Sequence, residues 1–487
     1  MIRSIAPVVY SSVGLLTGIV YFCTLVSLVS QEAGLVWFSI LLVAYLWFEI
    51  RRTAMRQRKL LFLHPAVLAS VITFILAFGL TNILYFLPED VIATVGLYPR
   101  VTESMNFLMV LVLLGAFAMW LGYRLGTGRR RIAGALARRG FLKKVLRHGY
   151  QTRPVFIVGC LIVSLLSRLL AIKLGIYGVN FTLAQINETA AYAQYIVIAE
   201  SLSKLALLGA ALQYYSAADR KPYSGSLLLV ILSYEVFFGF LSGMKSQVVM
   251  PFFIIGFCSY FQRSHFPKWL VPAIVASVFV AYLVIEPFRT ARFTDESFQN
   301  QNFTYILDTM FGDRSVASNK EGPAVGLLFL NRLNLTYVAS SGIEFAHAGP
   351  LPPNSPDFLT DIMLEPLYAV IPRAIWKTKP EADIGRWYAQ TVLGRDYNSL
   401  TSTAMSPFTY LYFAGGSIGV FLGFFIVGLI QRVCVERFLF AGSSGGAVVY
   451  FGILQGLVAL DGTSGFFVTL VRLTPMLLLA QYGLFRK

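Results

Sequence analysis

Several arginines and lysines between residues 286 and 405 are the side chains best suited to chemistry. A guanidinium group binds phosphate oxygens through two parallel N–H donors, so converging arginines can hold a phosphate or pyrophosphate. Arg373 and Lys377 lie on either side of Trp376 in the sequence. Tryptophan is enriched at the membrane–water interface, and cations beside it suit the headgroup level of a bilayer. The candidate phosphate ligands are Arg289, Arg292, Arg332, Arg373 and Lys377. The alternative is that these cations only reach toward headgroups or pair with neighbouring acids.

The same segment holds candidate general bases. Removal of a proton from a hydroxyl nucleophile needs an acceptor within hydrogen-bond reach, and a carboxylate or an imidazole can serve. The candidates are Glu344, His347 and Asp383, and we expect at most one of them to be the base. The alternative for each is a solvated or salt-bridged side chain.

Charged side chains inside apolar runs form a second group of candidates, because such charges are costly in a bilayer and usually functional. Arg168 and Glu235 lie in different apolar runs, and neither has an obvious partner in its own run. Glu200 and Lys204 are four residues apart, a spacing that allows them to pair on one helix. The alternative is that these charges form internal salt bridges that fix helix packing.

Other chemistries lack their characteristic residues. The sequence has no G-x-x-x-x-G-K-[ST] phosphate loop, no H-E-x-x-H and no Cys/His cluster, which argues against an ATP-driven pump and a zinc protease. The first outer loop holds a lone acid, Glu32, where a metal-dependent membrane glycosyltransferase usually shows acidic residues. We therefore expect no metal and no cofactor.

The composition indicates which elements must position these residues. Of the 487 residues, 56% are apolar and 13% are charged, and the mean hydropathy is +0.67. A soluble domain has about 25% charged residues and a disordered chain has low hydropathy, so both classes are excluded. The net charge of +16 lies mostly in short loops between apolar runs, which argues against nucleic acid as a partner. The four cysteines lie within or at the ends of apolar runs and indicate no disulfide framework.

The chain is predicted to be an all-α polytopic membrane protein, because about 20 apolar residues cross the hydrocarbon core as one helix. The first apolar run lacks a clear cleavage site, so we expect it to be retained. About twelve transmembrane helices are expected. They are residues 6–29, 34–50, 61–87, 105–124, 154–174, 196–215, 224–243, 248–262, 269–285, 406–430, 446–460 and 466–484.

Lysines and arginines in the short loops predict the orientation of these helices. Loops 51–59 and 124–153 are rich in basic residues. The alternate loops hold a single basic residue, Arg100; they are residues 30–33, 88–104 and 175–195. With twelve crossings, both termini are expected to be cytoplasmic, and the lipid bilayer is itself a partner of the basic loops.

One integral membrane domain in three parts is expected. Residues 1–285 supply transmembrane helices 1–9, residues 286–405 form a large periplasmic loop, and residues 406–487 supply helices 10–12. Segments 324–346 and 358–376 contain amphipathic runs, so we expect short helices that lie on or dip into the outer face of the bilayer. These helices are expected to cap a cavity open to the outer leaflet.

Three short motifs follow one another within residues 155–430. The first is Glu235 followed by Ser-Gly-Met-Lys, which ends at Lys245. The second is IPRAIWKTKP at residues 371–380, and the third is YLYFAGGSIG at residues 410–419. In order and placement they resemble motifs of the Wzy-type oligosaccharide repeat-unit polymerases, the bacterial O-antigen and exopolysaccharide polymerases.

The resemblance implies glycan chain extension on the periplasmic face of the bacterial inner (plasma) membrane. The donor would be a growing glycan on undecaprenyl pyrophosphate and the acceptor a single lipid-linked repeat unit, joined without a metal. The resemblance also adds Lys245 to the intramembrane candidates and admits a chain-length regulator protein as a partner.

Two other functions remain open. An O-antigen ligase-like glycosyltransferase would share the topology and the donor, and only acceptor assays would separate it from a polymerase. A lipid-linked glycan transporter or flippase is expected to carry polar residues along several helices near the membrane midplane. Here the charge is concentrated in one outer loop, which favours an enzyme.

Overall fold

The computed structural model describes most of the chain as helix. Its described residues are 2–88, 91, 101–125, 146, 151–174, 176–177, 183–216, 218–294, 325–353, 355–371, 376, 384–395, 403–440, 443–459 and 462–486. Within these ranges there is no β-ladder, and one isolated bridge joins Thr152 to Phe485. The all-α architecture expected from the sequence is confirmed.

Eight helices in the described ranges are long and apolar enough to cross a membrane, which agrees with a membrane protein. They are Ala6–Leu25, Gln31–Met55, Pro65–Phe86, Glu103–Leu125, Pro154–Lys173, Tyr195–Tyr215, Ser224–Leu241 and Pro407–Leu439. The four other predicted spans also coincide with helices, but they are not among these eight; they are residues 248–262, 269–285, 446–460 and 466–484.

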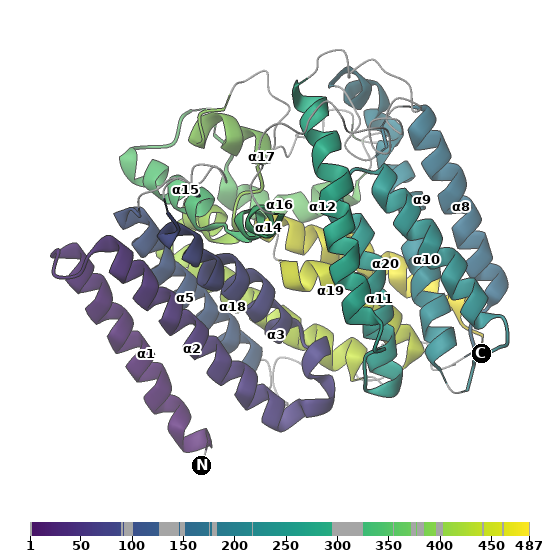
Figure 1. Cartoon of the computed structure of the whole chain (residues 1–487), viewed down its shortest axis with the longest axis horizontal. Helices are drawn as coiled ribbons and strands as arrows, with labels where there is room; N and C mark the ends of the chain where they lie inside the picture. The colour runs from purple at the N-terminus through teal and green to yellow at the C-terminus, as the bar shows by residue number, and fades with distance from the viewer. Residues whose placement is uncertain are drawn as a thin grey trace.

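The helices form two bundles that lie side by side (Figure 1). The first bundle contains α1 (Ile2–Leu25), α2 (Gln31–Gln57), the continuous helix α3–η2–η3 (Pro65–Ala69, Ser70–Gly79 and Leu80–Phe86), α5 (Glu103–Leu125) and α18 (Pro407–Cys434). The second contains α8 (Pro154–Lys173), α9 (Leu183–Tyr215), α10 (Ser224–Leu241), α11 (Lys245–Arg263) and α12 (Leu270–Thr294). Two further helices, α19 (Ser444–Ala459) and α20 (Gly462–Leu484), pack against both bundles.

Two glycines allow α5 and α18 to meet backbone to backbone. A Cβ atom at Gly122 would lie 2.0 Å from the carbonyl oxygen of Phe425. A Cβ atom at Gly428 would lie 2.0 Å from the carbonyl oxygen of Met119. Small residues permit such close approach between membrane helices, where packing rather than water exclusion drives association. This contact holds α18 in the first bundle, although α18 follows the whole second bundle in sequence.

In the described residues between α12 and α18, there are four short helices. They are α14 (Val325–Leu333), α15 (Thr336–Ala348), α16 (Phe358–Val370) and α17 (Ile384–Trp387), which continues as η5 (Tyr388–Val392). Figure 1 places α15 and α17 in the upper part of the molecule, whereas the two ends of the chain lie lower. The short helices expected in segments 324–346 and 358–376 are therefore present, and the first segment holds two of them.

Asn334 separates α14 from α15 and fixes both to η3. Its Nδ2 donates to the carbonyl oxygen of Thr81 at 3.0 Å, and its Oδ1 accepts from the Thr336 N–H at 2.9 Å. Thr336 Oγ1 donates to Oδ1 of Asn82 at 2.6 Å. Because these groups are buried, each hydrogen bond replaces one that water would otherwise make. The helices α14 and α15 are thus positioned by the end of a membrane helix. We call α14, α15, α16 and α17 the outer helices, after the outer loop in which the sequence predicts them.

The helix α18 is broken near its start. Gly416 has φ +61° and ψ −152°, a backbone conformation that residues other than glycine rarely adopt. The short piece before the break is capped by Ser406, whose side chain accepts from the Thr409 N–H. Thr409 Oγ1 donates to the carbonyl oxygen of Ala339 in α15 at 3.0 Å. The piece before Gly416 therefore packs with the outer helices, while the rest of α18 packs with α5.

Candidate functional site

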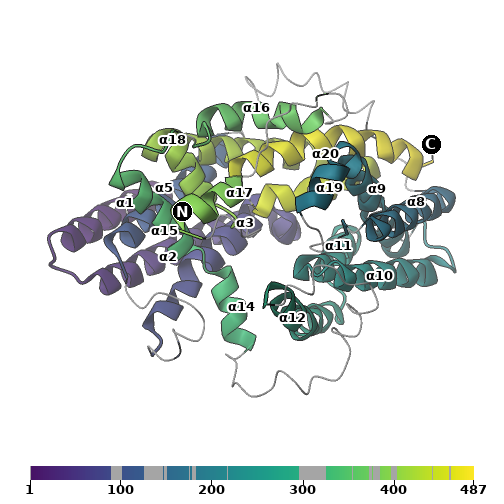
Figure 2. The ribbon, with the colours of Figure 1, turned by 90° about the horizontal axis from the view of Figure 1, so that it is seen from above.

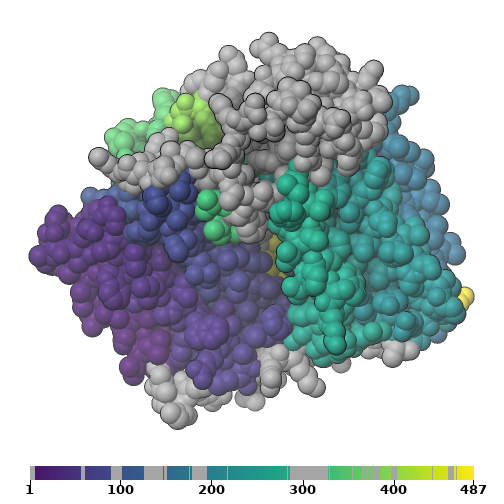
Figure 3. All heavy atoms as spheres, viewed as in Figure 1, coloured from purple at the N-terminus to yellow at the C-terminus, as the bar shows by residue number. Residues whose placement is uncertain are grey.

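A hollow separates the two bundles on the face shown in Figure 3, between the α3–η2–η3 helix and α12. The two bundles also meet through Phe62 of η1 (Arg58–Leu63), whose ring contacts those of Tyr260 and Phe266 at centroid distances of 5.5 and 5.4 Å. Within η2, Thr73 Oγ1 donates to the carbonyl oxygen of Val458 in α19 at 2.7 Å. The wall formed by η2 is π-helical, a rare geometry that recurs at functional sites.

Three of the predicted phosphate ligands belong to helices beside this hollow. Figure 2 shows α14 between η3 and α12, and α14 packs against η3. Arg332 lies in the last turn of α14 and is exposed. Arg289 and Arg292 lie in the last turns of α12, and their side chains are outside the described part of the structure. Arg373, Lys377 and Asp383 also lie outside the described residues.

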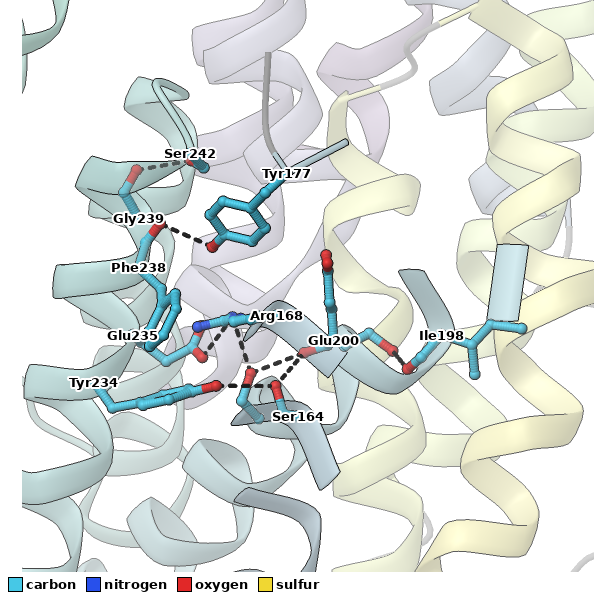
Figure 4. A network of polar contacts seen from close by, with 12 residues as sticks. Ser164, Arg168, Tyr177, Ile198, Glu200, Tyr234, Glu235, Phe238, Gly239 and Ser242 are labelled. Atoms are coloured by element: carbon cyan, nitrogen blue, oxygen red, sulfur yellow. Dashed lines mark hydrogen bonds and ion pairs between the residues drawn. The ribbon is translucent and has the colours of Figure 1, made fainter. Parts of the chain in front are cut away.

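A network of buried polar groups joins α8, α9 and α10 (Figure 4). Arg168 Nη2 donates to Oε1 of Glu235 at 2.8 Å and to Oγ of Ser203 at 3.0 Å. Tyr234 and Phe238 lie against the guanidinium, with ring centroids 4.8 and 5.0 Å from Cζ. We call these five residues the intramembrane network. Arg168 is 5% exposed and Glu235 is 2% exposed, so the charges neutralise each other away from water.

The network answers one question that the sequence left open. Arg168 and Glu235, which lack partners in their own helices, are partners of each other. This pairing supports the interpretation that the two charges fix helix packing. Nε and Nη1 of Arg168 are buried and have no hydrogen-bond partner among the described residues, so the guanidinium still has free donors.

Further residues in or beside the same helices contact this network. Glu200 supplies its backbone carbonyl to the hydroxyls of Ser164 and Ser203, each at 2.9 Å. Tyr177 follows α8 and donates its hydroxyl to the carbonyl oxygen of Phe238 at 2.9 Å. Lys245 begins α11 and is half-buried.

A second polar contact lies among the outer helices. The Nε2 atom of His347 in α15 and the hydroxyl of Tyr412 in α18 are 2.7 Å apart, and we call these two residues the outer pair. The ring of Phe107 contacts both, with centroid distances of 5.4 and 5.9 Å. His347 is exposed, as is Glu344, three residues earlier on the same helix. The imidazole is therefore oriented by a phenol and remains open to a reactant.

The predicted phosphate ligand Arg332 and the predicted base His347 are not brought together. They lie near opposite ends of α15, a helix in which the eleven steps from Thr336 to His347 span about 16 Å. Among the described residues, no group of three or more His, Cys, Asp or Glu side chains could hold a metal ion.

Sequence reasoning missed four participants. Ser203 and Tyr234 complete the surroundings of Arg168, and Tyr177 lies beside Phe238. Each is a neutral residue in or beside an apolar run, so no charge marks it in the sequence. Tyr412 belongs to the YLYFAGGSIG motif, and its position directly before Phe413-Ala414-Gly415 was the available signal.

Comparison with known proteins gives one family and no relative of known function. No curated protein and no solved structure gives a significant match to the chain. One family model matches residues 161–472, more than half of the chain, and its range includes the intramembrane network and the outer pair. The chain therefore belongs to the family described as a domain of unknown function, DUF8712.

Proposed function

We propose that the protein is a bacterial polysaccharide polymerase, a membrane glycosyltransferase that joins undecaprenyl-pyrophosphate-linked repeat units. The observation that carries this proposal is the hollow between the bundles, with Arg332 exposed at the end of α14 and Arg289 and Arg292 on α12. A hollow between membrane helices suits a prenyl chain, and arginines beside it suit the pyrophosphate that the chain carries.

The proposed setting is the inner membrane, with twelve crossings, both termini cytoplasmic and the outer helices in the periplasm. The basic loops support this orientation because positive charge is retained on the cytoplasmic side. The arrangement in Figure 1 also supports it, since the two chain ends lie away from α15 and α17.

The proposed reaction transfers the growing glycan to one new repeat unit. The acceptor hydroxyl oxygen bonds to the donor's anomeric carbon, and the bond from that carbon to the pyrophosphate oxygen breaks. Undecaprenyl pyrophosphate leaves, and its developing charge is stabilised by the arginines without a metal. The hydroxyl proton passes to a base, for which Glu344, His347 and Asp383 are the candidates. His347 is favoured because Tyr412 orients its ring.

Replacement of Arg332 tests the phosphate-binding part of this proposal. Loss of one strong charge contact in a water-poor site costs about 3 kcal/mol, or about two orders of magnitude in rate. Arg332→Ala should therefore stop glycan elongation at normal membrane abundance and cause single lipid-linked repeat units to accumulate. Arg332→Lys should rescue poorly, since lysine lacks the forked donor geometry. Arg395→Ala, at another exposed outer arginine, is the matched control and should elongate normally.

Arg373→Ala, in the IPRAIWKTKP motif, should give the same phenotype as Arg332→Ala.

The same elongation assay separates the alternative functions. Polymer that is made on the lipid carrier but not transferred to its final acceptor would indicate a ligase. Repeat units trapped on the cytoplasmic face would indicate a flippase. Near-normal polymer in Arg332→Ala would rule out its role in pyrophosphate binding.

A further inference from the structure

The outer helix α16 presents an apolar stripe that the described residues leave largely exposed. Leu359, Met363 and Leu367 are 58%, 69% and 58% exposed, and Ile371, just beyond the helix, is 37% exposed. Their spacing of four residues places them along one side of the helix. Four exposed apolar side chains in one row indicate a surface that is covered in the assembled system.

Its neighbour α15 provides an internal comparison. Both helices have 13 residues and both lie in the outer segment. The helix α15 buries Ala339 and Ile343 and exposes Glu344 and His347, the pattern of a helix that faces water. The helix α16 buries Phe358 on its inner side yet also exposes its apolar stripe. Two helices of equal length in one segment therefore present different surfaces.

The inner side of α16 packs against membrane helices. It contacts α20 and α18, and Figure 2 shows it running beside them along one edge of the molecule. Phe358 stacks on Phe413 of α18 at a centroid distance of 4.9 Å.

The apolar stripe of α16 matches one on the membrane helix that it touches. The candidate span in α18 exposes Ile418, Leu422 and Ile426, which are 72%, 51% and 42% exposed and again four residues apart. A row of this kind on a membrane-spanning helix faces acyl chains. The surface of α16 is thus of the same kind as the lipid-facing surface of α18.

We propose that α16 is immersed in the outer leaflet, with Leu359, Met363, Leu367 and Ile371 against lipid acyl chains. The N-terminal end of the helix is anchored at the polar level by Asp357, whose Oδ1 and Oδ2 accept from the N–H and the hydroxyl of Thr360 at 3.2 and 2.6 Å.

This immersion has a consequence for the motif that follows. Ile371 directly precedes Pro372 and Arg373, so the depth of the stripe fixes the depth at which the cationic motif begins. Contact of α16 with lipid does not depend on the proposed polymerase activity; its place in the outer leaflet rests on the orientation proposed above.

Nitroxide labels test the immersion directly. Met363→Cys, Leu359→Cys and Leu367→Cys would each be labelled in a chain without its native cysteines and reconstituted in phosphatidylethanolamine–phosphatidylglycerol nanodiscs. Collision rates with oxygen, which concentrates in acyl chains, and with a water-soluble nickel chelate would be compared. All three positions should favour oxygen, whereas a label at Arg395→Cys should favour nickel. The four native cysteines are removable in principle because none is paired among the described residues.

A second measurement does not require removal of the native cysteines. In membrane vesicles of the otherwise native chain, a membrane-impermeant maleimide should react with Cys at 395 at least tenfold faster than with Cys at 363. Preferential collision with nickel at 363 would show that α16 faces water and would overturn the proposal. Protection of a label at position 363 from both oxygen and the nickel chelate would show that a protein surface or a second copy covers the stripe. That result would also overturn the proposal.

Discussion

The intramembrane network and the outer pair differ in how far their polar side chains are buried and in how they are paired. In the network, Arg168 and Glu235 are almost fully buried and neutralise each other between three helices. In the outer pair, His347 is exposed and shares one hydrogen bond with Tyr412. A buried charge that loses its partner cannot be solvated, whereas an exposed imidazole that loses its partner can turn to water. The network is therefore suited to holding helices together, and the outer pair is suited to chemistry.

Arg168→Met should give the largest loss of stability, about 3–5 kcal/mol, because it leaves the Glu235 carboxylate buried without a partner. Thermal unfolding in detergent, followed by helical circular dichroism, would measure the loss. The double variant Arg168→Met/Glu235→Leu should recover much of it. A double variant that is as unstable as the single one would show that the pair itself does not hold the helices together.

Another buried polar residue, His64, sharpens the comparison because it makes a hydrogen bond to a neutral tyrosine. Its Nε2 lies 2.6 Å from the hydroxyl of Tyr123, and burial, followed by the nearby charge of Arg432, lowers its pKa from 6.5 to about 3. The folded state therefore favours neutral His64, whereas the unfolded chain takes up a proton as the pH falls below 6.5. Stability should be fully present above pH 6.5 and should fall by about 2 kcal/mol by about pH 5.

Denaturation between pH 7.5 and 5 would measure this effect. His64→Gln should flatten the dependence, whereas His265→Gln, at an exposed histidine, should retain it. An unchanged slope in His64→Gln would assign the dependence to other groups.

Tyr177→Phe should have a smaller effect, a loss of about 1 kcal/mol, since the buried carbonyl of Phe238 loses its donor. Tyr195→Phe, at a tyrosine that is 48% exposed, should change nothing and serves as the control. Equal unfolding temperatures for Tyr177→Phe and the parent protein would show that water replaces the lost donor.

The outer pair should give the smallest effect on stability and the clearest effect on activity. Tyr412→Phe and His347→Ala should each cost less than about 1 kcal/mol, because His347 is exposed. If His347 is the base, His347→Ala should slow elongation by about 10²–10⁴-fold. Unfolding and glycan length would be measured on the same preparations. Normal elongation in His347→Ala would leave the pair without a catalytic role.

Much of the fold could be predicted from hydropathy, because each apolar run long enough for the bilayer has little choice but to be helical. The division of segment 324–346 at Asn334 could not, since that break depends on hydrogen bonds to Thr81 and Thr336. The break at Gly416 similarly depends on contacts of the preceding residues with α15.

The candidate sites were less accessible to sequence reasoning. Charge identified Arg168 and Glu235 individually, but their pairing joins residues 67 positions apart, and no local pattern encodes it. His347 was identifiable as a candidate base, but its contact with Tyr412 joins residues 65 positions apart. The positions of Arg373, Lys377 and Asp383 remain predictions from the sequence.

The placement of α19 and α20 also affects the order in which the protein can be assembled. Both bundles precede these helices in the chain, yet Thr73 donates to Val458 and Gln431 donates to Leu457, both in α19. The Arg153 N–H likewise bonds to the carbonyl oxygen of Leu484 at 2.8 Å. During synthesis, the donors on Thr73, Gln431 and Arg153 therefore lack these partners until α19 and α20 leave the ribosome. A pause in translation before residue 444 would prolong a state that membrane chaperones and proteases can recognise.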